Sequence, residues 1–476
     1  MEKVLKTPVR MRLGWFIAQT LFSAVTCIEI FYYTGFLVDV ALIPLVLVGV
    51  IKTTTAILDF ASSIVLPIIM QKLKLPWGKY RSYFVLLPAI YCIFGALAIS
   101  KVIAGNDPAG MTINTIVIVV SYFISRFLWN LTDAASSTFT SVAARQYPDA
   151  QVTLSMWRGR GSASSSLWFG AIAGPMIALF IKATGSNTWG YTLMALVFFL
   201  INIVGYRVLF WSTKPLKQID MEELNVENTA ENKIKLVDIF KAVGTNTPLL
   251  ILWIYDVFRQ LAMFYGSGVM FFYFAHSLKA DWAISTSVLV GGIGGFLSGF
   301  IAAPIVAKLG TKRSLLLSMF GGAVVGIIMY ILNLKDPWAV MLIRAITGLL
   351  LGSSMVLITK TYADCSIYAE YKTGKDMRAT VMASFPIPIK IMSVFIGLVT
   401  TAAIAYTGYN AEKVQAGEMI IDELMIRRFD QIFFVVPAIF SAIAGILMLF
   451  YPSDKKFQEW GNEVNKRKGI TSTAAQ

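Results

Sequence analysis

The main pattern along this chain is a succession of long apolar runs separated by short polar stretches. A run of about 20 apolar residues is long enough to cross a bilayer as an α-helix. Twelve runs reach this length, with centres near positions 25, 55, 93, 125, 170, 200, 262, 295, 322, 349, 392 and 440. The short alternating segments of a membrane β-barrel are not seen in the sequence. The pattern therefore predicts an all-α membrane protein with twelve transmembrane helices.

One polar interruption is much longer than the others and lies between the sixth and seventh runs. With so few large apolar side chains it cannot bury a core of its own, so it is interpreted as a cytoplasmic linker. Two six-helix halves joined in this way are typical of major-facilitator transporters, which bind their substrate near the midplane between the halves. The predicted parts are an N-terminal half at 1–211, the linker at 212–247, a C-terminal half at 248–452 and a cytoplasmic tail at 453–476.

Composition supports a membrane protein, and the positions of the basic residues account for the positive net charge. The chain is 57% hydrophobic and only 14% charged, and its formal net charge is +14. Lysine and arginine gather in alternate loops, as the positive-inside rule requires, so the charge indicates orientation in the membrane and no binding of nucleic acid. We expect a multi-pass protein of the cell (inner) membrane, in contact with the lipid bilayer, functional as a monomer and with both termini in the cytoplasm.

The sequence offers few residues for catalysis or metal binding. It has three cysteines, Cys27, Cys92 and Cys365, all in apolar surroundings, and a single histidine, His276. A disulfide framework, a zinc cluster or a nucleophilic triad would need more of these residues. We therefore expect no enzymatic activity and no cofactor.

Charged residues inside the apolar runs are the candidates for function. Asp59 lies within the run Val38 to Met70. An ionisable group inside a bilayer is costly, so it usually faces a cavity and marks an ion or substrate path; a structural ion pair is the alternative. Asp256 and Arg259 are three residues apart on one predicted helix, and this spacing favours an intrahelical pair over a pocket.

Several short motifs together are similar to one family. Phe31-Tyr32-Tyr33-Thr34 ends the first run, Asp59 is followed by the basic turn Trp77-Gly78-Lys79-Tyr80-Arg81, and Ala363-Asp364 precedes Tyr368, Glu370 and Lys390. This set resembles the glycoside-pentoside-hexuronide:cation symporters of the major facilitator superfamily. The resemblance implies symport of a small glycoside, pentoside or related sugar with a cation, by alternating access. It also implies that the loop at 362–378 helps to close the inner side.

The resemblance implies a cation site at Asp59, Ser62, Ser63 and Asn130. Sodium-using members of the family have a second acid where this chain has Ser63, and sodium prefers several hard oxygen ligands. A single carboxylate in a poorly hydrated cavity favours a proton instead. The coupling ion is thus H⁺ or Na⁺, with H⁺ preferred. Lys390, on the eleventh run, is expected to tune this site electrostatically.

The same resemblance implies a sugar site at Asp133 and Arg158, where a carboxylate and a guanidinium can both bind sugar hydroxyls. Gln19 stands where the family has another sugar-binding acid, and Ser137 replaces an expected aromatic residue. The aromatic surface for stacking must then come from elsewhere, and the candidates are Trp15, Tyr33 and Trp129. Two other functions stay open: a lipid or lysolipid carrier of the same fold, and a membrane-embedded transferase.

Overall fold

The computed structural model describes residues 6–72, 75–101, 103, 105, 107–222, 241 and 243–467, and the secondary structure of these residues consists of helices joined by turns and short loops. Side chains are not described at 63–69, 71–72, 303, 356, 379 and 383. Within these limits, 12 helical segments are long and apolar enough to cross a membrane. This count confirms the twelve predicted spans. Most of the predicted linker, at 223–240 and 242, lies outside the described residues.

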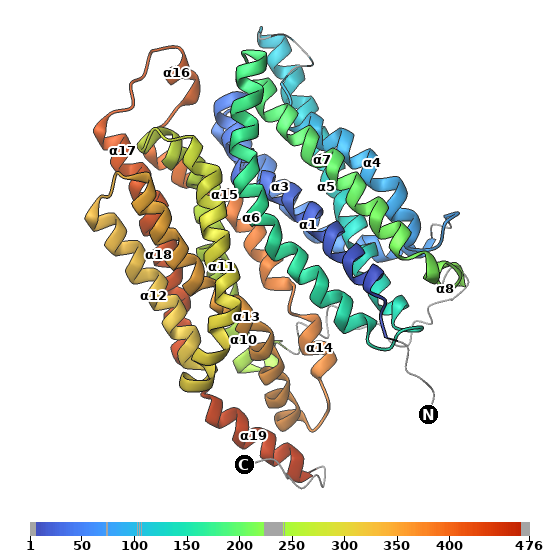
Figure 1. Ribbon diagram of the computed structural model, residues 1–476. Coiled ribbons are helices and arrows are strands. Elements are labelled where there is room, and N and C mark those ends of the chain that lie inside the picture. The colour runs from blue at the N-terminus through green and yellow to red at the C-terminus, as the bar shows by residue number, and fades with distance from the viewer. Residues whose placement is uncertain are drawn as a thin grey trace. The chain divides into compact units, whose positions relative to one another are not determined.

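The helices of the first half are long and joined by short connections (Figure 1). They are α1 (Val9–Phe31), α2 (Tyr33–Gly35), the π-helix η1 (Phe36–Val40), α3 (Leu45–Lys72), α4 (Arg81–Ala98), α5 (Pro108–Ala143), α6 (Ala150–Thr184), α7 (Asn187–Ser212), η2 (Lys214–Leu216) and α8 (Lys217–Glu222).

The second half repeats this style, with π-helical turns extending two of its spans. Its helices are α10 (Thr247–Phe272), η4 (Tyr273–Ser277), α11 (Trp282–Leu309), α12 (Thr311–Leu332), α13 (Pro337–Thr373), α14 (Arg378–Ala383), α15 (Ile387–Thr407), α16 (Ala411–Gln415), α17 (Glu423–Asp430), η5 (Gln431–Val435), α18 (Val436–Phe450) and α19 (Asp454–Arg467).

Contacts divide the chain into two compact units. The first comprises Met1–Asn228, Ser267–Gly292 and Gly397–Ile426, and the second comprises Thr229–Gly266, Ile293–Ile396 and Arg427–Gln476. The first unit therefore holds the predicted N-terminal half together with the end of α10, the start of α11 and the end of α15. The predicted boundaries of the N-terminal half at 211 and of the C-terminal half at 248 stay predictions.

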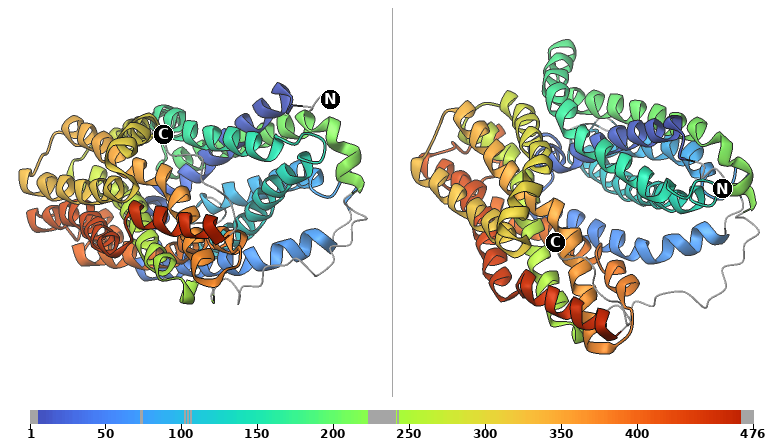
Figure 2. Two further views of the ribbon diagram at one scale, coloured as in Figure 1. Left: turned by 90° about the horizontal axis from the view of Figure 1, so that it is seen from below. Right: turned by 60° about the horizontal axis from the view of Figure 1, so that its bottom comes forward.

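Inside the first unit, α1 packs between α6 and α7, and these three helices run side by side in Figures 1 and 2. Small residues allow the close approach. A side chain at Gly161 of α6 would meet the backbone of Phe16 and Thr20 on α1. Helices in membranes associate through such small residues because burial of apolar surface gives no net gain in lipid. This packing brings α1 and α6 into register for the polar contacts described below.

A polar cluster joins the helix ends in the first unit around Asp39 of η1. Its carboxylate lies 2.8 Å from Nε2 of His276 and accepts a hydrogen bond of 2.9 Å from the Tyr409 hydroxyl. The Gln415 amide donates to the Asp39 carbonyl at 2.6 Å. Burial, and after it the Asp39 carboxylate, raises the pKa of the Tyr409 phenol, so Tyr409 is a hydrogen-bond donor at neutral pH. The single histidine thus holds helix ends together.

The second unit has its own apolar core, to which α10, α12, α13 and α18 contribute. Asp256 and Arg259 form an ion pair of 2.6 Å on α10, with side chains only 2% and 1% exposed. The interpretation of these residues as an intrahelical pair is confirmed. The expected loop at 362–378 is different from the prediction, because α13 continues as a helix to Thr373. Apolar positions such as Tyr362 and Cys365 are fully buried in the core and hold this extension in place.

The basic turn before α4 is held by a buried acid from the start of the linker. Asp220 of α8 is 0% exposed, and its carboxylate accepts from the backbone N–H groups of Tyr80 and Arg81 at 3.1 and 3.0 Å. Gly78 has φ +115°, and a side chain there would collide with Asp220. A carboxylate at a helix N-terminus satisfies free N–H groups and the helix dipole. The turn that carries the family motif is thus built by its contact with the linker.

Candidate functional site

Three residues predicted to bind the sugar lie in one cluster across α1, α5 and α6. Arg158 of α6 forms an ion pair with Asp133 of α5, and its Nε donates to the side-chain oxygen of Gln19 on α1 at 2.8 Å. Its Nη1 also donates to the hydroxyl of Ser137, one turn beyond Asp133. The side chains of Arg158 and Asp133 remain 23% and 34% exposed. A guanidinium held by several neutral and charged acceptors, and still accessible, can exchange some of them for ligand hydroxyls.

The aromatic candidates for sugar stacking differ in their surroundings. Trp15 is 1% exposed and stacks on Phe139, so it is part of the core. Trp129 is 7% exposed and lies flat against Phe22, with ring centroids 3.7 Å apart. Tyr33 is also buried at 1%. Trp15 is enclosed by protein, whereas Tyr33 and Trp129 line the pocket described below. A role of these rings in stacking a sugar stays a prediction.

Asp59 lies in a second cluster, built by three donors from α5. Arg126 contacts its Oδ2 through Nη2 at 2.5 Å, and the Asn130 amide donates to its Oδ1 at 2.7 Å. Arg126 also reaches Glu29 of α1 through Nη1 at 2.6 Å. The Tyr122 hydroxyl donates to the other oxygen of Glu29 at 2.5 Å. Two carboxylates therefore share one guanidinium, and the three groups carry a formal charge of −1 when ionised.

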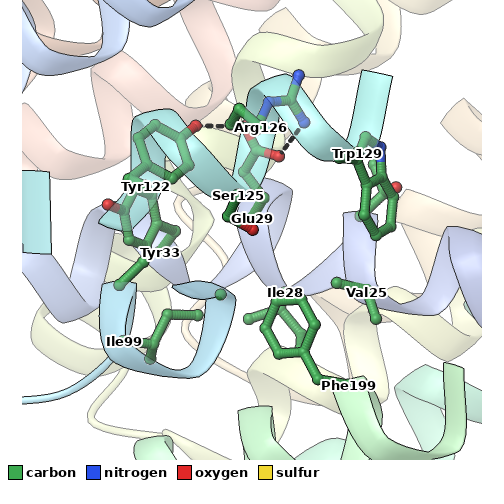
Figure 3. Close-up of a pocket in the computed structure, with 13 residues that line it drawn as sticks. Val25, Ile28, Glu29, Tyr33, Ile99, Tyr122, Ser125, Arg126, Trp129 and Phe199 are labelled. Atoms are coloured by element: carbon green, nitrogen blue, oxygen red, sulfur yellow. Dashed lines mark hydrogen bonds and ion pairs between the residues drawn. The ribbon is translucent and has the colours of Figure 1, made fainter. Parts of the chain in front are cut away.

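A partly open pocket of about 430 Å³ lies beside this cluster (Figure 3). Its walls come from α1, α4, α5 and α7 and are mainly apolar, with Ile28, Ile99 and Phe199 among them. Glu29, Arg126 and Tyr122 supply the polar side, and Figure 3 shows Arg126 and Tyr122 both joined to Glu29. The ion cluster thus has one side against protein and one side toward open space.

The other residues predicted for the cation site are placed differently. The Ser62 hydroxyl donates to the backbone carbonyl of Asp59 at 2.8 Å, so it is not directed at the carboxylate. The side chain of Ser63 lies outside the described residues. Lys390 is partly buried on α15 in the second unit. Its expected tuning of Asp59, and the role of the serines, stay predictions.

Arg126 and Glu29 were not among the sequence candidates, although the sequence carries their signal. Both are charged residues inside apolar runs, the property that drew attention to Asp59. On α5, Tyr122, Arg126 and Asn130 follow at intervals of four residues and therefore share one face. A search for charges inside every run, combined with this spacing, would have found them.

The two clusters are connected through α5. Asn130, Asp133 and Ser137 continue the stripe of Tyr122 and Arg126 at intervals of three and four residues. Arg126 and Asp133 are seven residues apart, which corresponds to about 10 Å along a helix. One rigid helix thus carries the donors of the Asp59 cluster and the acid of the Arg158 cluster.

Comparison with known proteins identifies the family of the chain. The sequence profile of the family described as "MFS/sugar transport protein" matches residues 16–455. The glucuronide carrier protein homolog of Escherichia coli (strain K12) is 23% identical over 447 residues, which cover 92% of this chain and 91% of that protein. The isoprimeverose transporter of Lactiplantibacillus pentosus is 23% identical over 440 residues, covering 91% of this chain and 86% of that protein.

Solved structures support the fold alone. A bacterial homologue of the human lysosomal transporter Spinster, in an inward-facing and unoccupied conformation, superposes with a TM-score of 0.63 at 13% identity, covering 95% of this chain and 97% of that one. The nucleoside transporter NupG gives a TM-score of 0.56 at 12% identity, covering 92% of this chain and 98% of that one.

The resemblance to glycoside-pentoside-hexuronide symporters is confirmed by the family profile and by the two sugar carriers. These relatives are transporters, and so the transferase alternative falls away. The chain therefore belongs to the MFS/sugar transport protein family and is a multi-pass sugar transporter of the major facilitator superfamily.

Proposed function

We propose that this protein carries a glycoside, pentoside or related sugar across the cell membrane together with a cation, by alternating access. Both termini lie in the cytoplasm in this proposal, as the distribution of lysine and arginine favours. The observation that carries the proposal is the Arg158 cluster, in which one accessible guanidinium is held by Asp133, Gln19 and Ser137 from two helices. These side chains are suited to pairs of sugar hydroxyls, which both donate and accept.

The coupling ion in this proposal is a proton. A sodium ion at Asp59 would lie against the Arg126 guanidinium on Oδ2, which carries a like charge and has no acceptor atom. Asn130 would also have to turn its amide oxygen toward the ion, because its nitrogen now donates to Oδ1. A proton needs no such cage. Because Glu29 and Asp59 share one guanidinium, one of them can take a proton while the other keeps the ion pair with Arg126. The protonated cluster is then neutral, which lowers the cost of passing through less hydrated states.

The sugar and the proton are linked through α5 in this proposal. Movement of Arg126 after protonation changes the position of the face of α5 that also carries Asp133. Binding of sugar at Asp133 changes the position of Arg126 in the same way. Two sites that bias the same conformational change raise each other's affinity by the same factor. Typical coupling free energies are about 1–3 kcal/mol.

The test is uptake of radiolabelled glycosides into proteoliposomes with an imposed proton or sodium gradient. We expect the parent protein to accumulate sugar with an inward proton gradient. Asp59→Asn should lose accumulation and keep sugar exchange, because exchange requires no net proton movement. Glu222→Gln, which neutralises an exposed acid on α8, is the matched control and should behave like the parent.

Other outcomes would separate the parts of the proposal. Accumulation driven only by sodium would reject the proton and keep the sugar. Accumulation that survives in Asp59→Asn would reject this carboxylate as the coupling group. Transfer of lipid between vesicles without competition by sugar would reject the sugar and favour the lipid carrier of the same fold.

A further inference from the structure

The polar cluster around Asp39 joins segments from both predicted halves of the sequence. Asp39 belongs to η1 in the N-terminal half, whereas His276, Tyr409 and Gln415 belong to the C-terminal half. All four residues lie in the first compact unit. Alternating access moves one half of a transporter against the other, so contacts between the halves form and break in each cycle. The Asp39 cluster is a set of such contacts.

Asp39 is the common acceptor in this cluster. Its two carboxylate oxygens contact different segments, since Oδ2 lies 2.8 Å from Nε2 of His276 and Oδ1 accepts from the Tyr409 hydroxyl at 2.9 Å. Its backbone carbonyl accepts from the Gln415 amide at 2.6 Å. The side chains of Asp39 and His276 are only 13% and 17% exposed. An ion pair at this degree of burial is screened much less by salt than a surface pair.

Aromatic rings pack around the same contact. The ring centroids of His276 and Tyr409 are 4.6 Å apart, and Phe272 of α10 lies 6.1 and 6.0 Å from them. One residue earlier, Phe271 lies so close to Gly35 of α2 that a side chain at Gly35 would collide with it. These rings fill the space between the end of the first span and the segments of the C-terminal half. The contact is therefore closed by packing as well as by hydrogen bonds.

The charge of one member of the cluster depends on pH, because histidine is the side chain that ordinarily titrates between pH 5 and 8. Among the described contacts, titratable groups face His276 from three segments: Asp39 of η1, Tyr409 after α15, and Asp281 in the turn before α11. An imidazolium is attracted by both carboxylates, and a neutral imidazole is not. Asp281 is joined to His276 by a short connection and stays near it. Only Asp39 is lost when the halves separate.

We propose that Asp39, His276 and Tyr409 form a latch that closes the outer side of this carrier, and that protonation of His276 strengthens the latch. This inference rests on the proposed function, which places the N-terminus in the cytoplasm and hence η1, after one span, on the outer side. An acidic exterior then favours the state that is closed to the outside. The equilibrium between the two access states thus depends on the external pH, separately from the proton taken up by the Arg126 cluster.

The test measures the distance across the outer ends of the helices in nanodiscs at pH 8 and pH 5. Spin labels are attached at Asn187→Cys on α7 and Glu423→Cys on α17, both exposed, while the native cysteines are buried. We expect the short-distance population to grow at pH 5. Asp39→Asn should lower the ratio of short to long distances at pH 5 by about 10- to 100-fold, because a charged hydrogen bond is lost. His276→Gln should make the ratio independent of pH.

Two further variants separate the latch from a general effect of charge. Tyr409→Phe removes one neutral hydrogen bond and keeps His276, so the ratio should fall by less than in Asp39→Asn and should still depend on pH. Glu412→Gln neutralises an exposed acid on α16, the helix that carries Gln415, and should behave like the parent. A maleimide that cannot cross membranes should label Asn187→Cys in intact cells, as the outer position requires.

A second measurement leaves the latch unchanged. The chain contains a single histidine, so isotopically labelled histidine gives one NMR signal, which belongs to His276. The pH at which this signal titrates should coincide with the pH at which the distance changes. This comparison and His276→Gln decide the question if Asp39→Asn does not fold.

The proposal is overturned if the distances in the parent do not depend on pH, if His276→Gln keeps the dependence, or if the two pH values differ. A parental ratio in Asp39→Asn, or labelling of Asn187→Cys only from the cytoplasm, also overturns it. None of these measurements needs a sugar. A carrier that shows the latch and moves no sugar would therefore overturn the proposed function alone, and sugar transport with unchanged distances would overturn the latch alone.

Discussion

The Asp133–Arg158 and Asp256–Arg259 pairs have the same chemistry in two different settings. Asp133 and Arg158 come from two helices, and their side chains are 34% and 23% exposed. Asp256 and Arg259 stand on one helix, and their side chains are 2% and 1% exposed. Arg158 holds additional neutral partners in Gln19 and Ser137, whereas Asp256 takes a further contact from the Tyr362 hydroxyl at 3.3 Å.

The comparison teaches that an ion pair inside a membrane helix does not by itself mark a site. A sealed pair on one helix cannot exchange its partners, because no ligand reaches it and its geometry is fixed by the helix. An accessible pair between two helices can exchange its partners for a ligand and can change its geometry. The strength of the pair then depends on how the two helices move. We therefore expect the sealed pair to determine stability and the accessible pair to determine binding.

The largest effect is expected at the sealed pair. Asp256→Ala leaves the buried Arg259 without its partner, and breaking such a pair should destabilise the protein by about 3–5 kcal/mol. The measurement is thermal unfolding in detergent, with sugar affinity determined at a temperature where the variant is still folded. Affinity should stay close to the parent value. A variant with parental stability and weakened sugar binding would reverse the roles assigned to the two pairs.

The next largest effect concerns the accessible pair. Arg158→Gln removes donors that the proposal assigns to the sugar, and two charge-assisted hydrogen bonds correspond to about a 100-fold loss of affinity. Stability should change little, since Asp133 is partly exposed and can be hydrated. The measurement is equilibrium binding of a labelled sugar. Unchanged affinity with a lowered unfolding temperature would make the pair structural, like Asp256–Arg259.

The Arg126 cluster tests a case between these two. Its side chains are 11–27% exposed, so Arg126→Gln should destabilise the protein by less than a sealed pair, about 2 kcal/mol. Because Asp59 and Glu29 then repel each other, adding Asp59→Asn should restore part of the loss. A double-mutant cycle measured by thermal unfolding gives the coupling between the two residues. Additive effects would mean that Arg126 and Asp59 do not share a cluster.

How much of this could be predicted from sequence depends on whether one helix or two are involved. Apolar runs of sufficient length predict the twelve spans, and the spacing of Asp256 and Arg259 predicts a pair within one helix. Contacts between helices need the register of one helix against another, which no local pattern contains. The family resemblance predicted that Asp133 and Arg158 lie together. No family motif predicted the contact between Arg126 and Glu29. The contact of Asp220 with the turn before α4 was not predicted for the same reason, because the sequence of a polar linker does not indicate which part of the protein it packs against.

The smallest effect is expected at Asp220, a sealed acid that accepts from the backbone N–H groups of Tyr80 and Arg81. Asp220→Asn keeps one acceptor oxygen but loses the charge that faces the N-terminus of α4, and it should destabilise the protein by about 1 kcal/mol. The control is Glu222→Gln, an exposed acid on the same short helix, which should have no effect. Thermal unfolding in detergent measures both. Asp220 is as buried as Asp256 and accepts from backbone N–H groups. A loss as large as that of Asp256→Ala would therefore show that the contacts of Asp220 stabilise the protein as strongly as the Asp256–Arg259 ion pair.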